Sequence, residues 1–379
     1  MTHTTEVLLA DRMARAAEIV APLAARHERD GRLSPDAVAA LVAAGVFKLL
    51  TPRAYGGAEA SLPALIASLD RLAQADGASG WCAMVGATSS LMGAYLPDDL
   101  AREVYADAGV VSCGVFAPTG KAVRTPEGLR VTGRWSFASG CQHSPWRMVG
   151  VVMSGDAGPV ARCVLLREGE SRVVENWDVM GLRGTGSHDL AADDVLVPEA
   201  RCFSLVEAPR HQGESYRVPV FGVLAMGVAA VAVGIAQGAL DRFIALAREK
   251  VPMGARRSLA HRERVQWAVA DAEARVRGAR ALLHEAAREV TEAVRARGEA
   301  TLDARATLRL AACHAVRDAA SAVDLLCETA GAGAIRATEP LQRMFRDVHV
   351  ATQHAMVSDA VAVLAGRVRL GIETEATML

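Results

Sequence analysis

The stretch that decides the fold is LRVTGRWSF at residues 129–137, where apolar and polar side chains alternate. A period of two is typical of a strand with one buried face. Other short apolar runs nearby are separated by Gly, Pro, Asp and Asn; they are VVSCGVF at 110–116, RMVGVVM at 147–153 and ARCVLL at 161–166. We therefore predict a compact β domain over residues 108–210.

On both sides of this β segment, apolar residues recur at spacings of three and four, which is typical of helices. The pattern is clearest at 7–25 and 37–49 before the segment, and at 263–296 and 302–326 after it. We predict an α-helical domain over residues 1–107 and a helical bundle domain over residues 211–379. The fold class is therefore mainly α with a central β domain.

The charges of the chain nearly cancel, since 42 basic and 43 acidic residues leave a formal net charge of -1. Such a chain has no strong field to attract nucleic acid or an anionic membrane surface, so neither is expected as a partner. The seven cysteines are scattered and form no C-x-x-C pair, as in a reducing compartment. The chain opens with a pattern typical of an amphipathic helix and not of a secretion signal, so we expect a cytoplasmic protein.

The segment Val218–Leu240 carries no charged residue and is long enough to span a membrane. Its composition favours another interpretation, because Ala, Gly and Val dominate and no aromatic belt flanks it. We predict a helix buried on all sides. Its small residues would let neighbouring helices approach closely; they are Gly227, Ala230, Gly234 and Gly238.

Short motifs exclude several kinds of site. The run GLRGTGS at 181–187 resembles a phosphate loop but is expected to lead into a strand, so the helix N-terminus that would hold a phosphate is missing. His349 and His354, expected on one helix, are five residues apart, whereas metal ligands on one helix face are three or four apart. No metal site is expected, and no G-x-S-x-G elbow of a serine hydrolase occurs.

Four segments, in this order, carry a resemblance to a known family: GVFKLLTPRAYGGAEAS at 45–61, GRWSFASG at 133–140, DVMGLRGTGSHDLAADDVLVPEARCF at 178–203 and PLQRMFRDVHVATQH at 340–354. Together they resemble the acyl-CoA dehydrogenases over nearly the whole chain. In that family an aromatic residue and a Ser or Thr two residues later lie against the flavin, and Phe137 and Ser139 match them. Arg343, Arg346 and Asp347 match the family's final helical motif. The resemblance implies an N-terminal helical domain, a middle β-barrel and a C-terminal four-helix bundle that assembles into a homotetramer.

Two departures from the family bear on the activity. Acyl-CoA dehydrogenases need a carboxylate to remove the proton α to the thioester. The two positions where family members keep this Glu fall on Ala355 and Leu224, which cannot accept a proton. Ordinary dehydrogenation is therefore disfavoured. His354 precedes the first position, and with GASGWCAMVGA at 77–87 it resembles the flavin-dependent monooxygenases of this fold.

That resemblance implies a monooxygenase that receives reduced FMN or FAD by diffusion from a separate flavin reductase. With O2 the flavin would form a C4a-hydroperoxide that hydroxylates or oxidises a small organic substrate such as an aromatic. Ser139 would hydrogen-bond near flavin N5 and slow the loss of H2O2. His354, if its pKa is near neutrality, would deprotonate a phenol or hydrogen-bond the peroxide. In the alternative interpretation Ser139 only satisfies backbone groups in a turn and His354 is a surface residue.

Other flavin contacts follow from the same resemblance. Ser112, Cys113 and Val115 match the strand that runs under the flavin ring. Gly331 matches a glycine that approaches flavin from a neighbouring subunit. Two further residues, Arg256 and Arg257, would hold a flavin phosphate as a charged fork or would be solvated cations beside a helix.

The substrate class stays open at this point, because ATSSLMGAY at 87–95 has Ser and Thr where several related monooxygenases have a His. Two alternative functions remain beside the monooxygenase. One is an acyl-CoA dehydrogenase-like FAD oxidoreductase with a non-standard base. The other is a non-catalytic member of the family that binds a small molecule.

Overall fold

The computed structural model describes residues 3–155 and 158–379, and the described chain begins with helices. They are α1 (His3–Val20), α2 (Ala24–Asp30), α3 (Pro35–Ala44), α4 (Leu62–Ala75), α5 (Gly77–Ser89) and α6 (Asp98–Val104). Local sequence sets their ends, as in α3. The Ser34 hydroxyl there accepts a hydrogen bond from the Ala37 N–H at 3.3 Å, and Gly45 closes the helix in the left-handed conformation with φ 76°. The expected helical beginning of the chain is confirmed.

The middle of the chain forms a seven-stranded sheet in the order β5-β6-β2-β1-β3-β4-β7. The strands are β1 (Ser112–Thr125), β2 (Gly128–Trp135), β3 (Trp146–Gly155), β4 (Gly158–Arg167), β5 (Arg172–Val174), β6 (Asp189–Val197) and β7 (Cys202–Phe203). Neighbouring strands are antiparallel except β1 and β3, which are parallel.

The sheet has its own apolar core. The largest side chain of this core comes from the stretch 129–137, on which the prediction of the sheet rests. Trp135, at the end of β2, is fully buried and donates its indole N–H to the Gly150 carbonyl of β3 at 2.6 Å. The central β domain is thus confirmed. In the described part of the chain no ladder joins β5 to β7, so the two edges do not meet in a closed ring of hydrogen bonds.

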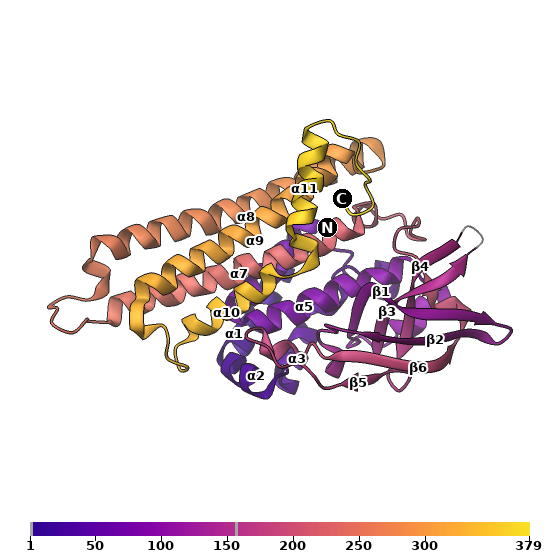
Figure 1. Ribbon diagram of the computed structural model, residues 1–379, viewed down its shortest axis with the longest axis horizontal. Coiled ribbons are helices and arrows are strands. Elements are labelled where there is room, and N and C mark those ends of the chain that lie inside the picture. The colour runs from indigo at the N-terminus through magenta and orange to yellow at the C-terminus, as the bar shows by residue number, and fades with distance from the viewer. Residues whose placement is uncertain (1–2, 156–157) are drawn as a thin grey trace.

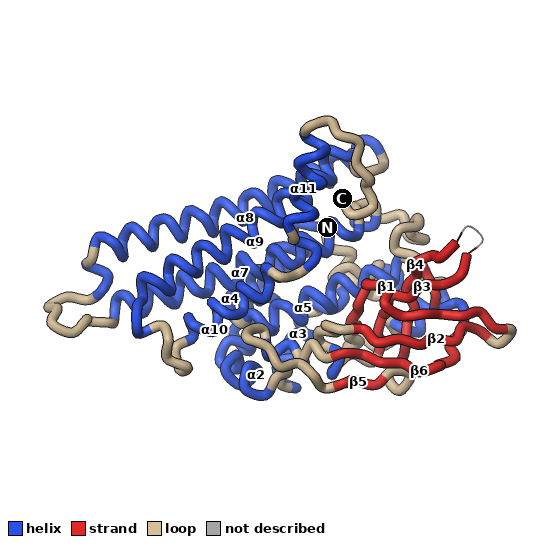
Figure 2. The backbone as a smooth tube through the Cα atoms, in the orientation of Figure 1, coloured by secondary structure: helices blue, strands red, loops and turns tan. Residues whose placement is uncertain are grey.

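The chain then returns to helices. They are α7 (Val220–Glu249), α8 (Glu263–Arg297), α9 (Leu302–Ala330), α10 (Pro340–Thr352) and α11 (Asp359–Arg369). The helices α7, α8 and α9 run side by side as a long bundle, and α10 packs against α7 and α9 (Figure 1). Figure 2 shows that the strands gather at one end of the molecule while this bundle extends away from them. The expectation that His349 and His354 share a helix is wrong, because α10 ends at Thr352.

Helix α7 is the centre of the bundle and packs against α4, α5, α8 and α9. It is long and apolar enough to cross a membrane, but 83% of its most apolar window is buried inside the protein, as in the core helix of a globular fold. Two of its glycines face backbone at close range. Gly234 and Gly238 lie against the carbonyls of Asp70 and Gln74 on α4 with no room for a side chain. The predicted close approach of helices at these small residues is confirmed.

All seven cysteines are free, and most are buried. Burial raises the pKa of every one of these thiols, and it raises that of Cys113 and Cys163 to about 12. These residues act as small apolar side chains in the packing.

Gly234→Ala is expected to destabilise the fold, because the added methyl group would overlap the Asp70 carbonyl of α4. Overpacking of this kind costs about 1–3 kcal/mol in the free energy of unfolding. Gly278→Ala is the matched control: it also lies inside a helix, but open space surrounds it, and alanine should stabilise α8 by up to about 1 kcal/mol. Urea denaturation of both variants beside the parent protein measures the two changes. Shifts of equal sign would contradict the close packing of α7 on α4.

Candidate active site

A chain of hydroxyl groups surrounds Ser139, which lies in the turn after β2 and is 5% exposed. The Trp81 indole N–H of α5 donates to Ser139 Oγ at 3.1 Å. Ser139 Oγ lies 2.6 Å from Ser187 Oγ, which lies 2.6 Å from Thr185 Oγ1. Thr185 in turn donates to the Leu182 carbonyl at 2.8 Å. The side chains of α5, the turn after β2 and the loop before β6 thus form one network.

The direction of the protons in this network follows from the last bond. Thr185 has a single hydroxyl proton and gives it to the Leu182 carbonyl, so it can only accept from Ser187. Ser187 therefore donates to Thr185 and accepts from Ser139. Ser139 donates to Ser187 and accepts from Trp81, which leaves one lone pair of Ser139 Oγ without a partner. The free capacity of Ser139 is that of a hydrogen-bond acceptor.

Phe137 lies two residues before Ser139 and, unlike the buried serine, is exposed. Its ring is 71% exposed although it is large and apolar, and its backbone has φ 67°. The left-handed conformation is strained for an aromatic residue and is retained where the surroundings enforce it. The turn is held by two backbone bonds to the loop before β6, from Ala138 to His188 and from Gly140 to Thr185, each at 3.0 Å. An exposed aromatic face is thereby fixed beside the Ser139 hydroxyl.

The first residues of β1 lie next to this turn. Cys113 shares the apolar core of the sheet with Cys141, and Val115 packs against the same core, while Ser112 is buried at the start of the strand. Because the side chain of Cys113 is fully engaged in that core, only its backbone is left to contact a ligand. Residues 116–119 of β1 have no ladder partner on β2 or β3, since the register to β3 is interrupted between Val115 and Gly120. Such irregular strand segments are common beside active sites, where they leave backbone groups free for a ligand.

His354 lies beyond the end of α10, where it precedes the 3-10 helix η11 (Ala355–Val357). Its ring meets the edge of the Trp81 ring at a centroid distance of 5.7 Å. The structure therefore brings the two residues predicted to be catalytic, Ser139 and His354, into contact with the same indole. His354 Nδ1 accepts the Met356 N–H at 3.2 Å, which places the ring proton on Nε2.

The electrostatics of His354 differ from the near-neutral value expected for a base. Burial and, to a smaller extent, the positive charge of Arg309 lower the pKa of the imidazole to about 4. The ring is therefore neutral at physiological pH, and its Nε2–H is available as a hydrogen-bond donor. This geometry favours the second of the two roles expected for His354, which is to donate a hydrogen bond.

Three of the predicted flavin contacts are far from this cluster within one chain. Arg256 and Arg257 lie in the loop between α7 and α8, and Gly331 follows α9. Both connections are at the end of the bundle away from the sheet (Figure 1). They are held together there, because Lys250 Nζ donates to the Ala330 carbonyl at 3.0 Å. Gly331 has φ 61° and open space around its Cα.

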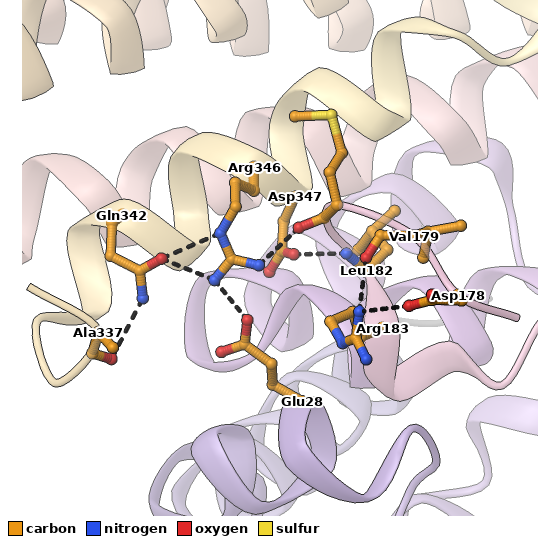
Figure 3. A network of polar contacts seen from close by, with 10 residues as sticks. Glu28, Asp178, Val179, Leu182, Arg183, Ala337, Gln342, Arg346 and Asp347 are labelled. Carbon is orange, nitrogen blue, oxygen red and sulfur yellow. Dashed lines mark hydrogen bonds and ion pairs between the residues drawn. The ribbon is translucent and has the colours of Figure 1, made fainter. Parts of the chain in front are cut away.

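The loop that carries Thr185 and Ser187 is fixed to α10 by a network of polar contacts (Figure 3). Arg346 donates to the Met180 carbonyl at 2.5 Å and also pairs with Glu28 of α2. The neighbouring Asp347 accepts the Leu182 N–H at 2.5 Å. The helix α2, the loop before β6 and α10 are thereby tied together at one point.

Asp347 is an unusual member of this network. Burial raises the pKa of its carboxyl to about 7, although the bond from the Leu182 N–H acts in the opposite direction, and the nearby Asp76 adds to the increase. Asp76 is also buried, but hydrogen bonds from His27 at 2.9 Å and from Ser79 at 2.6 Å outweigh burial and keep its pKa below the ordinary value. Two buried carboxyls side by side thus differ in ionisation.

Trp81, Thr185 and Ser187 were not predicted as site residues. Each belongs to a segment quoted from the sequence, since Trp81 lies in GASGWCAMVGA and the two hydroxyl residues lie in GLRGTGS. Hydroxyls at a spacing of two in a glycine-rich loop were a usable signal. Their partner in the turn after β2, 48 residues before Ser187, could be identified only from the fold.

Two protein families match parts of the chain. They are described as "Acyl-CoA dehydrogenase, N-terminal domain", at residues 4–98, and "Acyl-CoA dehydrogenase, C-terminal domain", at residues 226–359. The chain is 33% identical over 347 residues to an indole-3-acetate monooxygenase of Pseudomonas putida. The alignment covers 91% of this chain and 89% of the relative. It is 28% identical to the oxygenase component of an FADH(2)-dependent resorcinol hydroxylase of a Rhizobium species, with 97% and 95% covered.

The crystal structure of 3-HSA hydroxylase from a Rhodococcus species superimposes with a TM-score of 0.92 at 26% identity and covers 98% of each chain. The chain therefore belongs to the acyl-CoA dehydrogenase family. Within that family it is one of the flavin-dependent monooxygenases, which are oxidoreductases. The predicted family, fold class and enzyme class are confirmed.

Asp347→Asn should change how stability depends on pH. The folded-state pKa of about 7 lies above the unfolded value, so protonation of Asp347 stabilises the fold at low pH, and this contribution is lost as the pH rises through about 7. The variant keeps an oxygen for the Leu182 N–H but cannot ionise. Its free energy of unfolding, relative to the parent, should therefore increase from about pH 4 to about pH 7, by at most about 1.4 kcal/mol per pH unit.

Urea denaturation at several pH values measures this difference. Asp178→Asn is the control, since it removes a carboxylate of the same network that is 93% exposed, and the difference should then stay flat. A flat difference for Asp347→Asn as well would show that this carboxyl is ionised throughout.

Proposed function

We propose that the protein is the oxygenase component of a two-component system, which takes reduced FMN or FAD from a separate reductase and transfers one oxygen atom of O2 to an aromatic substrate. The observation that carries the proposal is the cluster of Ser139, Trp81 and His354. In the described part of the chain, no hydrogen bond or ion pair links a carboxylate to these three side chains. The cluster offers an acceptor and a neutral donor, and it lacks the base that dehydrogenation needs.

The residues around the cluster fit a flavin. An exposed aromatic face at Phe137 suits a planar ring system, and the backbone of residues 116–119, which has no ladder partner on β2 or β3, suits its amide-like edge. Ser139 Oγ keeps an acceptor position for a ring N–H. Reduced flavin, when bound there, supplies the two electrons that activate O2.

Each side chain of the cluster then has a defined task. Ser139 accepts a hydrogen bond from the reduced ring and holds that proton in place. His354 donates from Nε2 to an oxygen atom of the substrate or of the activated O2. Trp81 fixes both residues and, being 7% exposed, keeps water out of the space between them.

Aromatic substrates are supported by the relatives, whose names give indole-3-acetate and resorcinol as what they act on. Both are flat rings with polar substituents. We take indole-3-acetate as the first substrate to test, because the relatives that act on it are 33% and 31% identical to this chain over about nine tenths of its length.

The proposed reaction is tested with purified protein, a flavin reductase with NADH, FMN or FAD, and 18O2. One labelled oxygen atom should appear in the product of indole-3-acetate or a related aromatic, only when reduced flavin is supplied. If all O2 is recovered as H2O2 with these substrates, or if bound oxidised FAD is bleached by an acyl-CoA without O2, the proposal is contradicted.

Ser139→Ala should increase the share of O2 released as H2O2 and lower the product formed per NADH by about tenfold or more, because catalytic hydrogen bonds of this kind contribute at least that much. Ser68→Ala is the matched control, since Ser68 is 4% exposed and its hydroxyl bonds only the Ala64 carbonyl one turn before it in α4. Fluorescence titration with reduced flavin under nitrogen separates a loss of coupling from a loss of binding. Equal coupling in the two variants would remove Ser139 from the mechanism.

We further propose that the protein is a cytoplasmic homotetramer, with domains at residues 1–107, 108–210 and 211–379. The separation of Arg256, Arg257 and Gly331 from the cluster supports the assembly, because a neighbouring subunit would bring them to a flavin. Size-exclusion chromatography with light scattering should give four times the chain mass of 39.9 kDa. A stable monomer that still binds reduced flavin would contradict both the assembly and the role of these three residues.

A further inference from the structure

A buried arginine lies beside the proposed site without a counter-ion. Arg309, on α9, is fully buried at the place where α7, α9 and η11 meet. Its Nη1 donates to the Phe221 carbonyl of α7, and both Nη atoms lie 3.8–3.9 Å from the Met356 sulfur. Its Nε has no hydrogen-bond partner. Within the described residues, no carboxylate forms an ion pair with it.

The other two buried arginines among the described residues each have a carboxylate partner. Arg201, 6% exposed, has its Nη1 at 2.8 Å from both oxygens of the Glu170 carboxylate. Arg147, 4% exposed, donates to three carbonyls and to a hydroxyl, and has Glu168 at 3.9 Å. A guanidinium has five N–H donors, and Arg309 uses one of them on oxygen.

An unpaired buried charge is expensive, so its presence calls for an explanation. Replacing it with an apolar side chain of similar size would ordinarily cost the fold nothing and could stabilise it. A positive charge that folding does not need is explained if a ligand supplies the partner.

Arg309 lies next to the segments that are expected to face the substrate. Phe221 lies one helical turn before Leu224, and Met356 directly follows Ala355. Leu224 and Ala355 are the positions that match the catalytic Glu of acyl-CoA dehydrogenases, so the guanidinium lies between two segments expected to face the substrate. It is also close enough to His354 for its charge to lower the pKa of that imidazole.

We propose that Arg309 binds the carboxylate of an aromatic acid substrate and so selects aromatic acids over neutral aromatics. This inference rests on the proposed function, because it assigns a substrate class to the same site. A planar guanidinium matches a carboxylate with two parallel N–H···O bonds. A single enclosed arginine suits one negative charge, whereas a phosphate ester would leave most of its oxygens without donors.

Discrimination follows from the same burial. A neutral analogue leaves the guanidinium unpaired inside the protein, and sites that leave a buried polar group unpaired reject such analogues strongly. The carboxylate would also neutralise the charge that acts on His354.

The test compares indole-3-acetate with the neutral indole-3-acetamide, which has nearly the same shape. Dissociation constants are measured by isothermal calorimetry on the full-length protein, with and without FMN or FAD. The parent protein should bind the acid at least tenfold more tightly than the amide. A parent protein that binds the acid no better than the amide overturns the proposal.

Arg309→Met should remove the preference for the acid because it removes the charge, and Arg309→Lys should keep part of the preference because it keeps the charge. Arg317→Met is the matched control, because Arg317 lies two turns further along α9 and is 51% exposed. If Arg309→Met does not fold, Arg309→Gln is measured in its place. A folded neutral variant that still prefers the acid at least tenfold overturns the proposal.

Binding and oxygen transfer are measured separately, so failure of the carboxylate site and failure of the proposed reaction can be told apart. An acid preference that depends on Arg309, together with no labelled product from 18O2, supports the carboxylate site and contradicts the proposed reaction. Labelled product formed equally from acid and amide in the parent and in Arg309→Met supports the reaction and overturns the carboxylate site.

Discussion

The site depends on the hydrogen bond between the Asp347 carboxyl of α10 and the Leu182 N–H. Leu182 is held in a left-handed conformation with φ 50°, and its own carbonyl accepts the Thr185 hydroxyl. One residue is therefore bonded to the C-terminal bundle on one side and ends the hydroxyl chain on the other. The position of the loop and the direction of the protons around Ser139 both follow from it.

This arrangement separates the two hydrogen-bonding tasks of the site. The hydroxyl chain commits the Ser139 proton to the protein and leaves the oxygen as an acceptor. At His354, the Met356 N–H occupies Nδ1 and leaves Nε2–H as a donor. The indole of Trp81 touches both residues. An acceptor and a donor with fixed identities suit a reaction in which a ring N–H and an activated oxygen must be held at the same time.

The order of helices and strands could be predicted from the sequence because it rests on local periodicity. The close packing of α7 could be predicted as well, since Gly234 and Gly238 lie in the uncharged stretch Val218–Leu240, where glycine serves little else. Ser139 and His354 were reached through the family resemblance. Their shared contact with Trp81 could not be predicted in this way. Trp81 is 58 residues from Ser139 in the sequence and much further from His354. The neutral state of His354 depends on burial and on Arg309, which no local pattern marks.

The buried thiols have a consequence for a protein that handles reduced flavin and O2. Hydrogen peroxide attacks the thiolate form of cysteine, and the raised pKa of all seven cysteines keeps that form scarce. The burial that raises these pKa values thus also protects the sulfurs from sulfenic acid formation. The apolar cores therefore make the enzyme resistant to oxidation by the H2O2 that it releases when O2 is reduced without oxygen transfer to substrate.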